Sequence, residues 1–311
     1  MYASRLSLTD LSFRIGSCKR MKGIIIKNQN GYFSIYGDEG TLTLCRSRGK
    51  LKRSGQILVG DAVDYELSEQ GDGIITHVYP RRTVLHRPVV ANVDCLVLVA
   101  AIKTPDFNPF LLDKMIVLAE QAGICPVVFI SKADLAPEGA LQEAAMYEKA
   151  GYPSLAVSVT DPSAVERCRN LLSQVHGIIS FSGASGAGKS SLLNELLGNH
   201  HFLSGEVSRN TGRGKNTTRH AELVPAFEDS FLMDTPGYTF LELSGIEKEE
   251  LSYLFRDFRP YLGQCRFNDC RHDREPGCRI RQAAEEGTIE KRRYLSYLQM
   301  LNSLSSAKNR R

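Results

Sequence analysis

The stretch GASGAGKS, residues 183–190, decides the fold expected for this chain. It fits the pattern G-x-x-x-x-G-K-[ST], follows the apolar run GIISFS and leads into the helix-like run SSLLNELLG. Glycines at such a strand–helix turn let backbone N–H groups surround a phosphate at the helix N-terminus. The pattern predicts a nucleotide site with Lys189 on the β- and γ-phosphates and Ser190 on Mg²⁺. Candidate nucleotide-binding residues here are Gly183, Ala184, Ser185, Gly186, Ala187, Gly188, Lys189, Ser190 and Ser191.

A second motif, DTPG, begins at Asp234 after the apolar run FLM. Asp234 is expected to hold Mg²⁺ through water, and the Gly237 amide to sense the γ-phosphate. Between the two motifs, GRGKNTTRH at residues 212–220 offers Thr217 and Thr218, one of which can complete the Mg²⁺ shell. A Gly- and Arg-rich segment of this kind is expected to be ordered by the γ-phosphate and released after hydrolysis.

The SKAD motif, residues 131–134, follows the apolar run PVVFI and is typical of a guanine-reading loop. Asp134 can accept hydrogen bonds from guanine N1–H and N2–H₂, which adenine cannot offer. The stem of Lys132 can lie along the base plane, and a backbone N–H of the SVT run at 158–160 can reach guanine O6. Candidate base-binding residues are Ser131, Lys132, Asp134 and Ser158.

The order of these motifs is unusual, because in ordinary GTPases the base-reading loop follows the phosphate loop, whereas SKAD precedes it. A parallel sheet brings its strand ends to one edge in whatever order the chain visits them. Moving the termini changes the connectivity and leaves that edge in place. The motifs therefore predict a single site on a circularly permuted P-loop GTPase domain.

The 311 residues divide into four segments. Residues 21–86 carry about five short strand-like runs, which favour an N-terminal β-barrel of the OB-fold type that binds nucleic acid. Residues 87–245 alternate apolar strand-like runs with helical runs and predict the α/β GTPase domain. Residues 246–311 predict a mostly helical zinc-binding domain with a helix over 246–258. Residues 1–20 are expected to be a disordered extension or the product of a misplaced start codon.

Three cysteines and a histidine crowd into the run CRFNDCRHDREPGC near the C-terminus. Cys265, Cys270, His272 and Cys278 have the residue types and spacing of a closed tetrahedral Zn²⁺ shell. Because no ligand position stays vacant, the metal is expected to be structural. An iron–sulfur cluster is disfavoured by the histidine. The remaining cysteines are most simply buried free thiols: Cys18, Cys45, Cys95, Cys125 and Cys168.

The net charge of +4 is unevenly distributed, with −5 over residues 87–245 and a positive balance on both flanks. A basic flank suggests a polyanionic partner such as nucleic acid, while solvated surface charge is the other interpretation. No apolar run approaches the roughly 20 residues that span a bilayer, and no secretory signal is present, so a cytoplasmic location without a membrane partner is expected. The chain is also expected to be a monomer. Candidate phosphate contacts are Arg46, Arg48, Lys50, Lys52 and Arg53, and Arg266, Arg271, Arg274, Arg279 and Arg281.

The order SKAD, GASGAGKS, NTTRH, DTPG, flanked by the barrel-like segment and CRFNDCRHDREPGC, resembles the circularly permuted ribosome-assembly GTPases of the RsgA (YjeQ/YloQ) family. The resemblance runs from Met21 to near residue 300. It implies a GTP hydrolase that binds the small ribosomal subunit and its rRNA and assists its late maturation. It also implies hydrolysis stimulated by the subunit, one structural Zn²⁺, and Mg²⁺ bound with GTP.

Two positions depart from the usual pattern of the family, and a third lacks a residue that many GTPases have. Ser131 stands where the family usually has Asn, and the shorter side chain can lose a hydrogen bond to the base or the phosphate loop, worth about 0.5–1.5 kcal/mol. Asn216 stands where the family usually has a water-positioning His, and Tyr238 where many GTPases have a water-orienting Gln, so slow intrinsic turnover is expected. Candidate catalytic residues are Lys189, Asn216 and Thr218.

Two other functions remain open at this point. A nucleotide-gated RNA-binding scaffold with incidental turnover is compatible with Asn216 and Tyr238. A P-loop ATPase or small-molecule kinase is disfavoured by Asp134 and by the lack of a lid-like segment.

Overall fold

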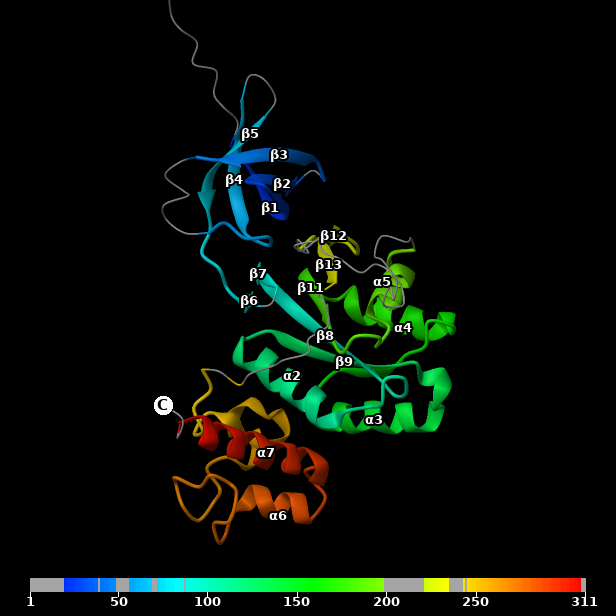
Figure 1. The fold of residues 1–311 in the computed structure, drawn as a ribbon, viewed down its shortest axis with the longest axis vertical. Helices are drawn as coiled ribbons and strands as arrows, with labels where there is room; N and C mark the ends of the chain where they lie inside the picture. Colours follow the sequence, from blue (N-terminus) through cyan, green and yellow to red (C-terminus); the bar gives the residue numbers. More distant parts are fainter. Residues whose placement is uncertain are drawn as a thin grey trace, which may run out of the picture.

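The computed structural model describes residues 20–38, 40–48, 56–68, 72–86, 88–198, 221–234, 243 and 245–308. These residues form an N-terminal barrel, a central α/β unit and a C-terminal helical unit, which follow one another in space as they do along the chain (Figure 1). Within these ranges no helix is long and apolar enough to cross a bilayer.

Five strands close into a barrel in the order β1-β2-β3-β5-β4, which confirms the predicted five-stranded barrel. Neighbouring strands are antiparallel, except that β3 and β5 run parallel. Gly73 is required where β5 passes β3, because a Cβ on Gly73 would lie 2.1 Å from the Cys45 sulfur. The strands are β1 (Arg20–Gln29), β2 (Tyr32–Gly37), β3 (Leu42–Ser47), β4 (Ala62–Leu67) and β5 (Gly73–Val78), and a hairpin of β6 (Val84–His86) and β7 (Val89–Ala91) follows.

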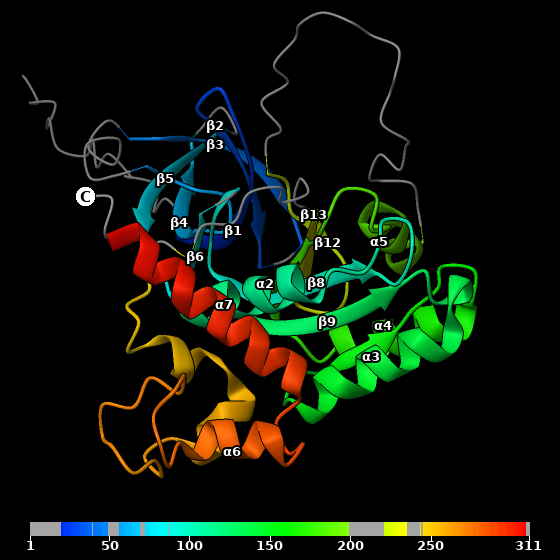
Figure 2. The same cartoon turned by 60° about the horizontal axis from the view of Figure 1, so that its bottom comes forward.

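Six strands form the central sheet in the order β10-β9-β8-β11-β13-β12, all parallel except the edge strand β12. The sequences of the central strands are continuously apolar because helices cover both faces of the sheet. Helices α2 and α3 lie on one face, and α4 and α5 lie on the other (Figure 2). The elements are β8 (Val93–Ala101), α2 (Pro109–Gln121), β9 (Cys125–Ser131), η1 (Ala133–Leu135), α3 (Pro137–Lys149), β10 (Ser154–Ala156), α4 (Pro162–Leu172), β11 (Gly177–Ser182), α5 (Lys189–Leu197), β12 (Val224–Pro225) and β13 (Ser230–Asp234).

Four of the five scattered cysteines lie in the described residues, and all four are free thiols. Cys45, Cys95 and Cys168 are buried as predicted. Cys125 is exposed, contrary to the prediction, because it is the first residue of β9 at the rim of the sheet. Cys18 lies outside the described residues.

The C-terminal unit differs from the sequence prediction over residues 246–258, where an α-helix was expected. Two 3₁₀ helices occupy this part of the chain, η2 (Leu251–Leu254) and η3 (Arg256–Tyr261). Phe255 separates them in an extended conformation with φ −103° and ψ 110°, and its ring is fully buried. The extended conformation that buries this ring therefore interrupts the helix at Phe255. Pro260 also disfavours a longer helix, because it lacks the N–H that such a helix would need. Helices α6 (Arg279–Glu285) and α7 (Lys291–Lys308) complete the unit.

Candidate nucleotide site and metal group

The phosphate loop connects β11 to α5, as the sequence predicts. Gly183 has φ +152°, and a Cβ at this position would lie 2.1 Å from the Val99 carbonyl oxygen of the neighbouring strand. Gly188 caps the N-terminus of α5 with φ +89°. The loop thus needs glycine at both of its invariant pattern positions, once for close backbone approach and once for a left-handed turn.

Lys189, the first residue of α5, is buried and folds back over the loop. Its Nζ donates to the Gly183 and Ala184 carbonyl oxygens at 3.1 and 3.0 Å. Burial lowers the pKa of Lys189, while the nearby Asp234 carboxylate acts in the opposite direction. An ammonium group held in this way lies where it can exchange the loop carbonyls for phosphate oxygens.

Ser190 and Asp234 form the pair that the sequence assigns to Mg²⁺. The Ser190 hydroxyl donates to Asp234 Oδ2 at 2.6 Å, although the two residues are 44 positions apart in the chain. Asp234 is the last residue of β13, which pairs directly with β11, the strand before the phosphate loop. A hydroxyl and a carboxylate are hard oxygen donors of the kind that Mg²⁺ prefers, so the donor set fits that ion.

The base-reading loop lies beside the phosphate loop and is bonded to it. The Ser131 hydroxyl donates to the Ala187 carbonyl oxygen at 2.6 Å. The shorter serine was expected to lose a hydrogen bond to the base or the phosphate loop. The bond to the phosphate loop is present, because buried Ser131 closes β9 directly beside that loop.

Asp134 is oriented by residues of the SVT run. The Ser158 hydroxyl donates to Asp134 Oδ1 at 2.6 Å and lies 2.8 Å from the Thr160 hydroxyl. Lys132 has a left-handed backbone with φ 55°, and its Nζ donates to the Thr104 carbonyl oxygen. Sequence reasoning missed Thr104 and Thr160, since a backbone carbonyl has no signature and Thr160 was considered only for its backbone.

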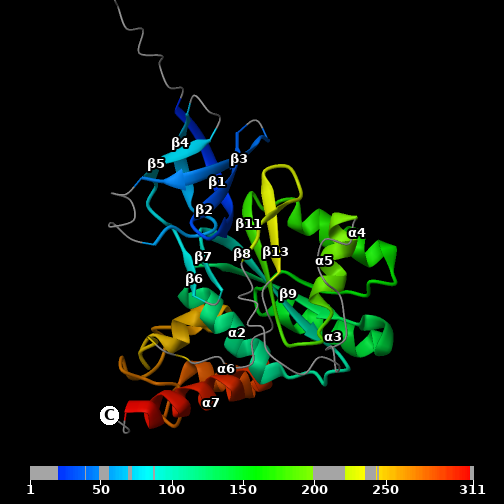
Figure 3. The ribbon, with the colours of Figure 1, turned by 45° about the horizontal axis from the view of Figure 1, so that its top comes forward.

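The strands that carry these loops lie side by side, so the described residues of the predicted nucleotide site meet at one edge of the sheet (Figure 3). The phosphate loop follows β11, the base loop follows β9 two strands away, and Asp234 ends β13 on the other side. The motifs follow one another along the chain in a different order from that of ordinary GTPases. In space, however, their loops lie together and form one site. Four predicted site residues lie outside the described residues: Asn216, Thr217, Thr218 and Gly237.

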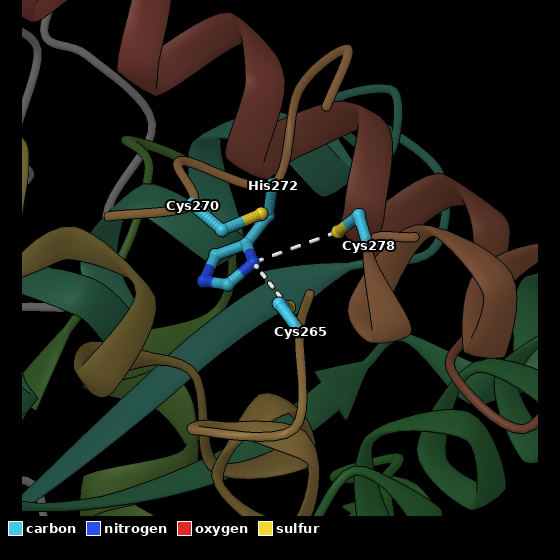
Figure 4. Close-up of side chains that lie close together, drawn as sticks. All are labelled: Cys265, Cys270, His272 and Cys278. Atoms are coloured by element: carbon cyan, nitrogen blue, oxygen red, sulfur yellow. Dashed lines mark hydrogen bonds between the residues drawn. The ribbon is translucent and has the colours of Figure 1, made fainter. Parts of the chain in front are cut away.

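The C-terminal unit brings together the four side chains predicted to bind metal. Figure 4 shows the three cysteine side chains gathered around the imidazole. His272 Nδ1 lies 3.5 Å from the Cys265 sulfur and 3.6 Å from the Cys278 sulfur, and all four ligand atoms lie within 4.8 Å of one another. The Cys270 sulfur completes the group, which could hold a metal ion.

The surroundings of this group suit metal binding. Burial lowers the pKa of His272, which favours the neutral imidazole that a metal requires. Backbone N–H groups of Arg279 and Arg281 donate to the Cys265 and Cys278 sulfurs, each at 3.4 Å. Contacts of this kind hold the sulfur atoms in place and stabilise their thiolate form.

Comparison with known proteins gives the same picture over nearly the whole chain. The family model described as RsgA GTPase matches residues 78–244, and the one described as RsgA N-terminal domain matches residues 22–75. The "Small ribosomal subunit biogenesis GTPase RsgA" of Shouchella clausii is 40% identical over 294 residues, covering 93% of this chain and 99% of that protein. The protein of the same name from Caldanaerobacter subterraneus is 39% identical over 295 residues, covering 94% and 99%.

Solved structures agree with the fold. The crystal structure of YloQ, titled "a circularly permuted GTPase", matches with a TM-score of 0.77 at 29% identity, covering 93% of this chain and 96% of that one. YjeQ from Thermotoga maritima matches with a TM-score of 0.77 at 35% identity, covering 92% and 99%. The N-terminal segment and the GTPase segment both match RsgA family models, the curated relatives align over nearly the whole chain, and the chain belongs to the RsgA GTPase family.

Proposed function

We propose that this chain is a GTPase that binds the small ribosomal subunit and its rRNA, acts late in the subunit's maturation, and hydrolyses GTP faster when bound to it. The observation that carries the GTPase part is the hydrogen bond from Ser131 to the Ala187 carbonyl, which joins the base loop to the phosphate loop. The names of the relatives support the ribosomal part. The cytoplasmic location and monomeric state expected from the sequence are part of the same proposal.

In this proposal Asp134 accepts hydrogen bonds from guanine and Lys189 binds the β- and γ-phosphates. Ser190 and Asp234 hold Mg²⁺, which polarises the phosphoryl group when it is bound. Ser131, Lys132 and Ser158 keep the base loop in position. Thr218 as a further Mg²⁺ ligand, with Thr217 as its alternative, Asn216 beside the attacking water and Gly237 on the γ-phosphate stay predictions from the sequence.

We further propose that Cys265, Cys270, His272 and Cys278 hold one structural Zn²⁺. Three thiolates and one imidazole are the donor set that favours zinc, and they leave no position for a reacting water. Arginines around the group, and Arg46 and Arg48 on the barrel, supply positive charge for rRNA phosphates. The other predicted barrel contacts lie outside the described residues: Lys50, Lys52 and Arg53. The domain limits expected from the sequence, at residues 21, 87 and 246, belong to the same proposal.

Phosphate release from GTP, measured with and without purified small subunits, tests the function directly. We expect slow release by the free chain and faster release with subunits, and neither with Lys189→Ala. Turnover that subunits leave unchanged would favour a nucleotide-gated RNA-binding scaffold. Competition by ATP as strong as that by GTP would instead indicate an ATPase or kinase.

A further inference from the structure

The barrel contacts the strands that lead to Asp234, at the outer edge of the central sheet (Figure 3). Lys27 of β1 forms an antiparallel bridge with Glu222, two residues before β12. The Lys27 ammonium donates to both Glu222 carboxylate oxygens, at 2.9 and 3.0 Å. Barrel strand β1 is therefore joined to the segment that leads into the edge strand β12.

A bulge in β1 makes a second contact of this kind. The pairing of β1 with β2 shifts register between Ile25 and Lys27, which leaves Ile26 as the extra residue. Its carbonyl accepts a hydrogen bond from the Leu223 N–H at 2.9 Å. Its side chain packs in the core of the α/β unit, whereas that of Ile25 packs in the barrel core. The bulge thus turns one barrel residue outward onto the GTPase domain.

The third contact is aromatic. The ring of Tyr36 on β2 meets the ring of Phe231 on β13 edge to face, with centroids 5.3 Å apart and an interplanar angle of 86°. Phe231 lies three residues before Asp234 on the same short strand. Val224 of β12 pairs with the intervening Leu232. A continuous set of contacts therefore runs from the barrel through β12 and β13 to the hydrogen bond between Asp234 and Ser190.

We propose that the barrel positions the magnesium-binding pair of the GTPase site, with Lys27, Ile26 and Tyr36 as its positioning residues. This inference rests on the proposed function. The hydrogen bonds, the ion pair and the ring contact of these residues involve neither the base loop nor the phosphate loop, so they act through β12–β13 on Asp234. Binding of the base and of the β-phosphate is independent of them, whereas the Mg²⁺ requirement of hydrolysis depends on them. A ligand that displaces the barrel thereby alters hydrolysis.

Charge reversal of the ion pair tests this inference in the full chain. The variants are Lys27→Glu, Glu222→Lys and the double reversal, with Lys22→Glu and Glu228→Lys as controls at exposed positions on β1 and in the β12–β13 turn. The readouts are the Mg²⁺ concentration for half-maximal GTP hydrolysis and the Kd for GDP in EDTA. Each single reversal is expected to raise the Mg²⁺ requirement about twofold to fivefold, as for a half-exposed ion pair, and the double reversal to restore it.

The aromatic contact gives an independent test with its own control. Tyr36→Leu is expected to raise the Mg²⁺ requirement about twofold to tenfold, the worth of an aromatic pair, and Tyr32→Leu on the solvent-exposed end of the same strand to leave it unchanged. The Kd for GDP in EDTA is expected to stay within about twofold of wild type throughout.

Two outcomes overturn the proposal and leave the proposed function standing. Single reversals with the wild-type Mg²⁺ requirement would show that the barrel does not position Asp234. Variants that lose GDP affinity in EDTA in parallel would show that the contacts support the whole domain. A wild-type chain that bound no GTP would refute the proposed function itself, and the inference with it.

Discussion

The C-terminal unit is attached to the GTPase domain by a buried arginine, Arg293 of α7. One guanidinium nitrogen donates to Asp113 of α2 at 2.6 Å, and two others donate to Asp257 of η3 at 2.8 and 2.9 Å. The side chain of Arg293 is 1% exposed and that of Asp113 is fully buried. Tyr152 and Phe255 place their rings 5.2 and 5.1 Å from the guanidinium carbon.

Arg293→Met removes the charge and keeps most of the volume. Two buried carboxylates then lose their partner, and breaking a buried pair in this way costs about 3–5 kcal/mol. Total stabilities of about 5–15 kcal/mol make this a large loss. Arg292→Met is the matched control, because Arg292 pairs with Glu143 at a half-exposed site and its loss is expected to cost about 1 kcal/mol or less.

Urea unfolding followed by far-UV circular dichroism measures both variants, since the chain contains no tryptophan. The reasoning would be refuted by a loss below about 1 kcal/mol for Arg293→Met, or by equal losses for the two variants. Such a result would mean that water or a rearranged side chain replaces Arg293 as the partner of the Asp113 and Asp257 carboxylates.

The loss of stability caused by Arg293→Met is expected to depend on pH, and the pKa of Asp113 sets the direction of that dependence. Burial raises the pKa of Asp113, and the attraction of Arg293 opposes that rise. Without the arginine the pKa in the folded protein rises further above its unfolded value. A raised carboxyl pKa contributes stability that is present below the unfolded pKa and lost as pH rises through the folded one. The deficit is therefore expected to be smaller at about pH 5 than at about pH 8.

Three further outcomes follow from the site. Ser131→Ala is expected to lower stability by about 1–3 kcal/mol, because it leaves the buried Ala187 carbonyl without that donor, and Ser131→Asn to recover part of the loss in the same urea assay. Lys189→Ala is expected to abolish measurable GTP binding in a fluorescence titration, yet to reduce stability little, because burial disfavours the Lys189 charge. Zinc uptake, followed by dye-detected proton release, is expected to liberate protons and to weaken as pH falls, because burial raises the pKa of Cys270 to about 12.

The nucleotide loops could be predicted because each is a contiguous motif that directly follows an apolar strand. Parallel topology then brings their ends to one edge, so the meeting of Asp134, Lys189 and Asp234 required only the strand pattern. The four candidate metal ligands lie within one short run, and their spacing alone predicts the group.

Other features depend on tertiary contacts that leave no local pattern. Phe255 interrupts the expected helix over 246–258 because its ring enters the C-terminal core. Arg293 lies in a basic helical run, and such a run is typical of a solvent-exposed helix face. The side chain of Arg293 is buried because it pairs with Asp113 and Asp257, and their positions depend on the tertiary fold. The bulge at Ile26 lies within an unbroken β-branched run, so the sequence does not indicate which residue leaves the barrel.

The central claim is that loops from distant parts of the chain form a single guanine site in permuted order. Binding of GDP and xanthosine diphosphate by wild type and by Asp134→Asn tests it most directly, because the asparagine amide can donate to the xanthine oxygen that replaces the guanine amino group. We expect wild type to prefer GDP, because guanine donates two hydrogen bonds to the charged Asp134 carboxylate, together worth about 3–6 kcal/mol. We expect Asp134→Asn to prefer the xanthine nucleotide. An Asp134→Asn chain that bound GDP as wild type does, while Lys189→Ala abolished binding, would place the base elsewhere and contradict the account.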